Sequence, residues 1–273
     1  MRPRSVAFRA VSRVRLDSLL AERGLFASRS RAAAAVIAGD VHLGPGRRRA
    51  EKPGQLVDTE VELAVDAPPP FVSRGGVKLC NALDALGVAV AGRHCLDVGA
   101  STGGFTDCLL QRGAAHVVAL DVAYGELDYK LREDARVTVM ERVNARALTR
   151  EQLPNAPALV VLDVSFISLE KVLPAVLGCL APRFDCLAMV KPQFEAGRGA
   201  VGKGGVVRDP AIRRAALVSV AACATAAGAT LLGFASSRLP GPAGNRETFA
   251  WLAEAGRPGA VEDPEAAALE VDP

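Results

Sequence analysis

Two lysines and two acids in this sequence have the types and positions needed to act together on a proton. Lys191 ends an apolar stretch in "AMVKPQF", and Lys78 lies in "SRGGVKL". Asp163 ends a second apolar stretch in "ALVVLDV", and Glu247 lies in "GNRETF". The carboxyl ends of parallel strands form the active-site edge of an open α/β sheet. We therefore expect Asp163 and Lys191 to share that edge.

Such a set suits the removal of a proton from a weakly acidic hydroxyl group. A lysine can accept that proton only when burial and a neighbouring cation lower its pKa toward neutrality. We predict Lys191 as the base, with Lys78 orienting the hydroxyl and steadying the developing negative charge. The two acids would orient the amines. If Lys191 stays charged, proximity and alignment must do most of the work.

Each residue also has a plainer interpretation when it is taken alone. Lys191 fits a solvated surface lysine, and Asp163 fits a helix cap next to Ser165. Glu247 fits a surface ion pair with Arg246. The functional interpretation requires all four side chains to gather at one site.

A glycine-rich stretch, "LDVGASTGGFTDCLL", joins an apolar strand to an apolar helix. Its glycine spacing is not the GxGxxG of dinucleotide sites or the GxxxxGKS of phosphate loops. A wider loop without a pyrophosphate nest suits the amino-acid end of S-adenosylmethionine. Asp97 would accept from the ammonium group of that cofactor, Asp121 from its ribose hydroxyls, and Asn144 would meet the adenine edge. The predicted cofactor-binding residues are Asp97, Gly99, Ala100, Ser101, Gly103, Gly104, Phe105, Asp121 and Asn144.

Apolar runs alternate with helical patterns along most of the chain. This alternation predicts an α/β fold with a mostly parallel sheet and helices on both faces. The last two strands have no helix between them and should form a hairpin, which is the outline of a Rossmann-like class I methyltransferase with seven strands. The predicted strands are 94–98, 116–120, 137–140, 158–164, 185–190, 229–237 and 247–252.

The first part of the chain is strongly basic. Up to Lys52 it holds twelve basic residues against four acids, which predicts a polyanionic partner. Helices over 15–24 and from Ser28 to Gly39, followed by short strands around "GRRR", form a small α+β unit. It resembles the RNA-binding module of ribosomal protein S-four and of pseudouridine synthases. Its arginines should crowd one edge and grip phosphates. The predicted RNA-binding residues are Arg15, Arg29, Arg31, Arg47, Arg48, Arg49 and Arg74.

The composition of successive segments predicts the domain boundaries. Residues 1–13 form a disordered basic tail, 14–67 the RNA-binding domain and 68–75 a linker stiffened by three prolines. Residues 76–255 form the catalytic domain, and 256–273 a disordered acidic tail. Within the catalytic domain, the glycine-rich, basic segment 195–210 suggests a mobile lid that grips RNA.

Several classes of protein are not indicated. The sequence has no run of eighteen uncharged apolar residues, so no transmembrane helix is predicted. The basic start lacks the apolar centre of a signal peptide. The six cysteines form no CxxC pair and are typical of reduced thiols in a cytoplasmic protein. With three scattered histidines, no metal is expected.

Two other methylation chemistries fit less well. Base N-methyltransferases carry a proline-rich loop such as NPPY after the fourth strand, where this chain has "LDVSFISL". Carbon-5 methylation of pyrimidines needs a cysteine nucleophile. Cys179 and Cys186 are the cysteines closest in sequence to the fourth and fifth strands. Both are expected to lie away from the end of the sheet that binds the cofactor.

The chain resembles the TlyA family of rRNA 2′-O-methyltransferases, which is related to the FtsJ group with its Lys-Asp-Lys-Glu tetrad. The matching stretches span Val14 to Leu252 and are "RLDSLLAERGLFASRSRAAAAVIAG", "SRGGVKL", "LDVGASTGGFTDCLL", "LDVSFIS", "VKPQFE", "GGVVRD" and "GNRETF". The resemblance implies that the tetrad is Lys78, Asp163, Lys191 and Glu247. It also implies a cytidine in ribosomal RNA as target and S-adenosylmethionine as donor, with S-adenosylhomocysteine as product.

Two alternatives of other classes stay open at this point. One is a catalytically silent RNA-binding or ribosome-assembly factor that keeps the cofactor fold. The other is a haemolysin, a name that members of this family have carried. The predicted tetrad argues against the first, and the lack of an amphipathic insertion segment argues against the second.

Overall fold

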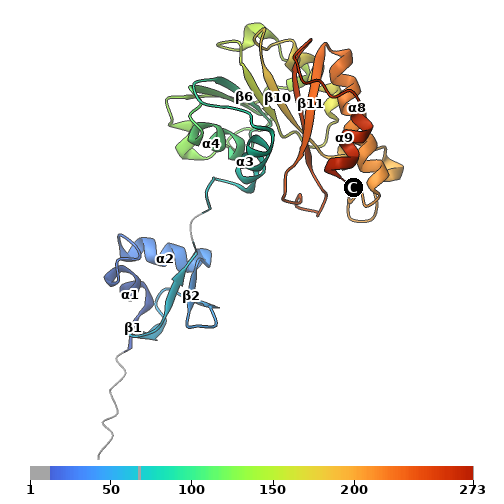
Figure 1. Ribbon diagram of the computed structural model, residues 1–273. Helices are drawn as coiled ribbons and strands as arrows, with labels where there is room; N and C mark the ends of the chain where they lie inside the picture. The colour runs from blue at the N-terminus through green and yellow to red at the C-terminus, as the bar shows by residue number, and fades with distance from the viewer. Residues whose placement is uncertain (1–12, 67–68, 273) are drawn as a thin grey trace, which may run out of the picture. The chain divides into compact units, whose positions relative to one another are not determined.

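The computed structural model describes residues 13–66 and 69–272, which form two compact units that meet in sequence at Pro69 and Pro70 (Figure 1). The predicted basic tail, 1–13, lies outside the described residues except for Arg13, which opens a strand. The predicted linker, 68–75, differs from the structure in its second half. Val72 N donates to Asp107 of the larger unit, and a helix already begins at Arg74.

The smaller unit contains two helices and two small sheets. Leu16, Leu20, Val36 and Val41 are buried in its core. Ser28 Oγ accepts from Arg31 N at the start of the second helix, as expected of an N-cap. The short strands expected around "GRRR" belong to two separate sheets, ordered β1-β4 and β3-β2-β5. The elements are β1 (Arg13–Arg15), α1 (Leu16–Glu22), α2 (Arg29–Ala38), β2 (Val41–Leu43), β3 (Arg48–Arg49), β4 (Leu56–Asp58) and β5 (Leu63–Val65).

The larger unit is built on a seven-stranded sheet ordered β11-β12-β10-β9-β6-β7-β8. Strand β12 runs antiparallel to both of its neighbours, β10 and β11, and the other strand pairs of this sheet are parallel, so the predicted mostly parallel sheet with a terminal hairpin is confirmed. The strands are β6 (His94–Val98), β7 (His116–Leu120), β8 (Val137–Met140), β9 (Leu159–Leu162), β10 (Asp185–Val190), β11 (Ala229–Ser236) and β12 (Thr248–Glu254).

Helices cover both faces of this sheet because successive strand residues point to opposite sides. On β6, Leu96 and Val98 pack on the face covered by α6, α8 and α9, and Cys95 packs on the face covered by α3 and α4. Between β8 and β9 the predicted helix is replaced by two short 3-10 turns. The helices are α3 (Arg74–Leu86), α4 (Gly104–Gln111), α5 (Tyr129–Arg132), α6 (Leu173–Leu177), α7 (Pro192–Glu195), α8 (Pro210–Ala226) and α9 (Pro264–Val271).

The disorder predicted for 256–273 is wrong for the part of this segment that the structure describes. Helix α9 begins at Pro264, with Asp263 as its N-cap, and packs against α8 and β11 (Figure 1). Ala268 is fully buried in the core of the larger unit. Alanine-rich composition suggested disorder, but alanine is also the best helix former, and tertiary packing decided the outcome. Among the described residues, no helix is long and apolar enough to cross a membrane.

Candidate active site

The carboxyl ends of the central strands bring the predicted site residues to one edge of the sheet. Asp97 lies on β6, Asp121 directly follows β7, Asp163 directly follows β9, and Lys191 directly follows β10. Because β12 is antiparallel, Glu247 enters that strand at the same edge. Strand order therefore brings side chains from distant parts of the chain to one edge of the sheet.

The glycine loop after β6 approaches β9 closely. Gly99 has φ +84°, and a Cβ added there would lie 2.6 Å from the carbonyl oxygen of Asp163. Gly103 also has a positive φ, +95°, where the loop turns into α4. Only glycine combines this backbone conformation with so close an approach. These two glycines therefore allow the loop between β6 and α4 to lie directly against the end of β9, where Asp163 is located.

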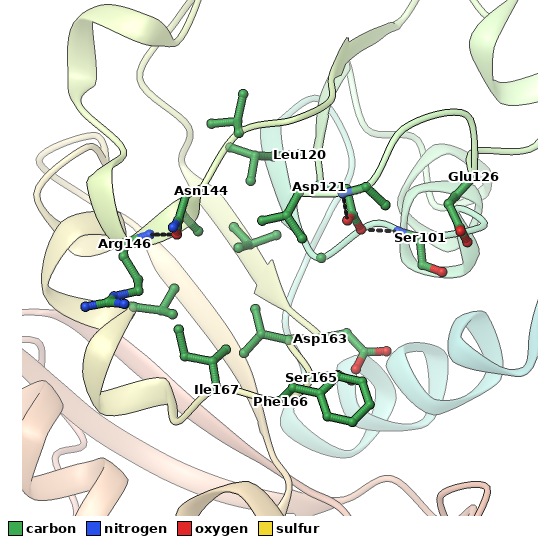
Figure 2. A pocket seen from close by; sticks show the side chains of 18 residues that line it. Ser101, Leu120, Asp121, Glu126, Asn144, Arg146, Asp163, Ser165, Phe166 and Ile167 are labelled. Carbon is green, nitrogen blue, oxygen red and sulfur yellow. Dashed lines mark hydrogen bonds between the residues drawn. The ribbon is translucent and has the colours of Figure 1, made fainter.

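A cavity of about 480 Å³ lies between this loop and the ends of β7 and β9 (Figure 2). Asp121 stands on its wall and accepts from Ser101 N and Ala123 N, both at 2.8 Å. Asn144 lies on the opposite part of the wall, and its Oδ1 accepts from Arg146 N at 3.1 Å. Two of the predicted cofactor residues thus face the same space from different strands.

Asp97 lies beneath the loop and is not among the residues that line the cavity. It is fully buried; its Oδ2 accepts from Thr106 Oγ1 at 2.7 Å, and its Oδ1 has no partner among the described residues. Burial raises the pKa of Asp97 to about 7, against the hydrogen bond from Thr106, and the nearby Asp163 adds to the increase. A buried carboxylate oxygen without a donor fits the ammonium group predicted to meet it, directly or through water.

The four predicted catalytic residues form two close ion pairs. Lys78 Nζ donates to Glu247 Oε2 at 2.5 Å, and Lys191 Nζ lies 2.5 Å from Asp163 Oδ1. Lys78, Lys191 and Glu247 are each less than a tenth exposed. Lys191 is thus no solvated surface lysine, and Glu247 is no surface partner of Arg246.

A second cavity, of about 360 Å³, adjoins the first. Lys78 and Arg74 line it, together with the turn from Gly99 to Thr102. Asp163 and Gly99 line both cavities, so the two spaces meet beside the ion pairs. Arg74 NH2 also donates to Pro240 O at 3.1 Å. One member of each ion pair therefore lines a cavity: Asp163 lines both, and Lys78 lines the second.

Ser165 and Phe166, which follow Asp163 in the chain, were not predicted as site residues from the sequence. Ser165 Oγ accepts from Lys191 Nζ at 2.8 Å, which gives that ammonium a second oxygen. Phe166 has φ +62° and is 92% exposed, with its ring centroid 5.3 Å from that of Phe194. Figure 2 shows Phe166 at the rim of the first cavity. The sequence signal that could have identified Phe166 as a site residue is an aromatic residue shortly after an aspartate at the end of a strand.

The predicted mobile lid is partly tied down. Asn245, which is buried, accepts from Val207 N at 2.9 Å and donates to Gly205 O at 2.8 Å. One side-chain amide thereby fixes the second half of the segment to the loop that carries Glu247.

The predicted RNA-binding arginines do not form a single edge. Arg15 and Arg29 converge on Asp17, with shortest distances of 2.7 and 3.5 Å. The hydrogen bond from Arg15 lowers the pKa of Asp17 to about 2. Arg47 pairs with Asp66, Arg49 donates to Ala38 O, and both lie at the other sheet with Arg48. Arg31 is exposed on α2, and Arg74 belongs to the larger unit.

Comparison with known proteins gives several similarities. The sequence model described as "FtsJ-like methyltransferase" matches residues 71–254. The chain is 51% identical over 242 residues to "16S/23S rRNA (cytidine-2'-O)-methyltransferase TlyA" of Mycobacterium tuberculosis, covering 88% of this chain and 90% of that protein. It is 42% identical over 190 residues to "Hemolysin A" of Brachyspira hyodysenteriae, covering 69% and 78%. The solved structure "Putative hemolysin from Streptococcus thermophilus" aligns with a TM-score of 0.72 and 38% identity over 96% of both chains.

Proposed function

Because this chain belongs to the FtsJ-like methyltransferase family, we propose that it transfers a methyl group from S-adenosylmethionine to the ribose 2′-hydroxyl of a cytidine in ribosomal RNA. The TlyA relative from Mycobacterium tuberculosis carries this activity in its name. The observation that supports it most directly is the pair of buried ion pairs, Lys78–Glu247 and Lys191–Asp163, at the junction of two cavities.

The first cavity has the side chains that S-adenosylmethionine requires. Asp121 would accept from its ribose hydroxyls, and Asn144 would meet the adenine edge. Asp97 would receive its ammonium group beneath the loop through the oxygen that lacks a donor. The backbone of residues 99–104 would line the amino-acid end. When bound, the cofactor supplies an electrophilic methyl carbon, which this arrangement would hold next to Asp163.

The tetrad then acts on the hydroxyl group in the second cavity. Lys78 orients the ribose oxygen and steadies its developing negative charge. Before it can act as the base, Lys191 must release one proton from its ammonium group. Its neutral amine then takes the hydroxyl proton at Nζ, and Asp163 and Ser165 hold that nitrogen in place. Glu247 fixes Lys78. Alignment of the two reacting atoms contributes the remaining rate enhancement.

Methylation of a base carbon has no support from the thiols. None of the six cysteines lines either cavity, and burial raises the pKa of Cys95 and Cys108 to about 12. A thiol that stays protonated and remote cannot attack a pyrimidine ring.

The smaller unit supplies a surface for RNA. Its arginines would bind phosphates without reading the base sequence, so that the target nucleotide is selected by RNA shape. A ribosomal RNA substrate places the reaction in the compartment of the ribosomes, the cytoplasm.

A direct test supplies S-adenosylmethionine labelled in its methyl group together with ribosomal subunits, and maps the label by mass spectrometry of nucleosides. We expect label on the 2′-oxygen of a cytidine with the wild-type protein and none with Lys191→Ala. Label on a base, or no label with any subunit, would overturn the proposal.

A further inference from the structure

Three consecutive residues, 245 to 247, hold three different parts of the larger unit. Asn245 binds the backbone of residues 205–207, and Glu247 binds Lys78 of α3. Between them, Arg246 NH1 donates to Asp272 Oδ1 at 2.8 Å. The carboxylate of Asp272, just after α9, therefore contacts the residue next to a member of the tetrad.

Asp272 is buried and accepts hydrogen bonds from several arginine side chains. It is 4% exposed, and it accepts from Arg213 Nε at 2.5 Å and from Arg213 NH2 at 2.8 Å. Arg213 also donates through NH1 to Arg208 O at 2.7 Å. Asp272 O accepts from Arg214 NH1 at 3.1 Å. The carboxylate of Asp272 thereby joins Arg213 of α8 to the loop that carries Glu247, and Arg213 extends this link to Arg208 in the segment before α8.

The loop around Glu247 leaves little room for displacement. A Cβ added at Gly241 would lie 2.5 Å from Glu247 Oε1, so the loop backbone covers that carboxylate. Glu247 itself is 3% exposed. A shift of Arg246 must therefore be transmitted to Glu247, and from there to Lys78.

We propose that Asp272 is a positioning residue for catalysis, which aligns the Glu247–Lys78 pair through Arg246 while touching neither cofactor nor substrate. The inference rests on the proposed function. Asp272 lies beyond residues 71–254, which match the FtsJ-like family model, so this alignment comes from a segment outside the matched domain. Its role follows from the contacts of this chain alone.

The test uses the full chain with Asp272→Asn, which removes the charge but keeps the size of the side chain. Glu270→Gln is the matched control, because it makes the same charge change at an exposed position of α9. We expect kcat to fall about tenfold or more in Asp272→Asn, since small misplacements of catalytic groups are costly. The KM for S-adenosylmethionine should stay within about twofold of the wild-type value, because the cofactor residues are not involved.

Arg246→Gln provides a second variant with a separate readout. Its side chain is 66% exposed, so its loss should leave the melting temperature nearly unchanged while lowering kcat. The double variant should be no slower than Asp272→Asn alone, because both changes break the same link. Additive effects, or an Asp272→Asn protein that loses thermal stability but keeps the wild-type kcat per folded molecule, would overturn the proposal.

Hydrogen exchange without RNA separates this proposal from the proposed function. Amides of residues 237–247 should exchange faster in Asp272→Asn than in the wild type, and at the wild-type rate in Glu270→Gln. Equal exchange in Asp272→Asn and the wild type would refute the link. A wild-type protein that fails to methylate ribose would overturn the proposed function, while the exchange rates would still decide whether Asp272 orders the loop.

Discussion

Lys78 Nζ lies 2.5 Å from Glu247 Oε2, although 169 positions separate the two residues in the sequence. Helix α3 supplies the ammonium, and the entry to the antiparallel strand β12 supplies the carboxylate. Both side chains are almost completely buried. Each charge is therefore compensated mainly by the other, which has consequences for stability as well as for catalysis.

Removal of one partner of this pair should destabilise the fold more than removal of both. Glu247→Leu leaves the Lys78 ammonium buried and unpaired, at a cost of roughly 3–5 kcal/mol in the free energy of unfolding. The double variant Lys78→Met, Glu247→Leu should recover much of that loss, and all of these variants should be inactive. Urea denaturation measures the effect, and a double variant less stable than Glu247→Leu would contradict it.

Replacement of Lys191 by arginine tests whether this residue takes the proton. Arginine keeps the positive charge but cannot be deprotonated in proteins, so Lys191→Arg should lower kcat by roughly 100-fold or more. Calorimetric affinity for S-adenosylhomocysteine should remain, and Lys171→Arg, at an exposed position, is the control. Activity close to that of the wild type would assign the rate enhancement to alignment instead.

Asp97 should make cofactor binding depend on pH. Its pKa is raised to about 7, so the carboxylate that binds an ammonium group is lost as the pH falls through about 7. We expect the affinity for S-adenosylhomocysteine to be roughly severalfold lower about one unit below that pKa than one unit above it, and Asp97→Asn to bind weakly at both. Titration calorimetry at the two pH values is the measurement, and equal wild-type affinities would refute the prediction.

The same residue should limit the stability of the cofactor-free protein. A carboxyl group whose pKa is raised by folding contributes stability at low pH, and this contribution is lost as the pH rises from its ordinary value, 3.8, through about 7. Asp97→Asn removes the group that ionises, so its stability does not fall in this way as the pH rises. Its melting temperature without cofactor should therefore exceed that of the wild type at about pH 8, and the difference should shrink at about pH 5.

Gly99→Ala should show that the close approach to β9 matters beyond backbone strain. Both Gly99 and Gly125 have a positive φ, but only at Gly99 would a Cβ contact another residue, the carbonyl oxygen of Asp163. Gly125→Ala should lose about 1–3 kcal/mol of stability from strain alone. Gly99→Ala should lose more and should also lose cofactor affinity. Similar results for the two variants in both assays would contradict the prediction.

Substitution of exposed arginines in the smaller unit should weaken RNA binding without affecting the cofactor. We expect Arg31→Gln with Arg48→Gln to reduce affinity for ribosomal RNA and to flatten its dependence on salt by about one unit of slope for each phosphate that the two arginines bind. The affinity for S-adenosylhomocysteine is the internal control. An unchanged salt slope would show that these two residues do not bind phosphate.

The parallel strands could be predicted from the sequence because buried strands are continuous apolar runs. The predicted ranges 94–98, 116–120, 137–140 and 185–190 match the observed strands. Their order along the sheet determines which strand ends meet, and this placed Asp163 and Lys191 at a common edge.

Other features depend on interactions that no local pattern reveals. Helix α9 presents Ala268 and Val271 to the core. Asp272, which follows this helix, binds Arg213 across 59 positions of the sequence. In the smaller unit, the excess of arginine was evident from composition, but the division of these side chains between Asp17 and Asp66 was not. Asp97 could be assigned to a strand end, whereas its complete burial beneath the loop required the packed structure.

The position of β12 makes the pairing of Lys78 depend on the last strand of the sheet in chain order. This strand inserts between β10 and β11 and is the last of the sheet in chain order. During translation the other six strands are synthesised before residue 248. Glu247 arrives with that final strand, so a partly synthesised chain lacks the partner of Lys78. A chain that stops before residue 247 therefore leaves the Lys78 ammonium without its carboxylate partner.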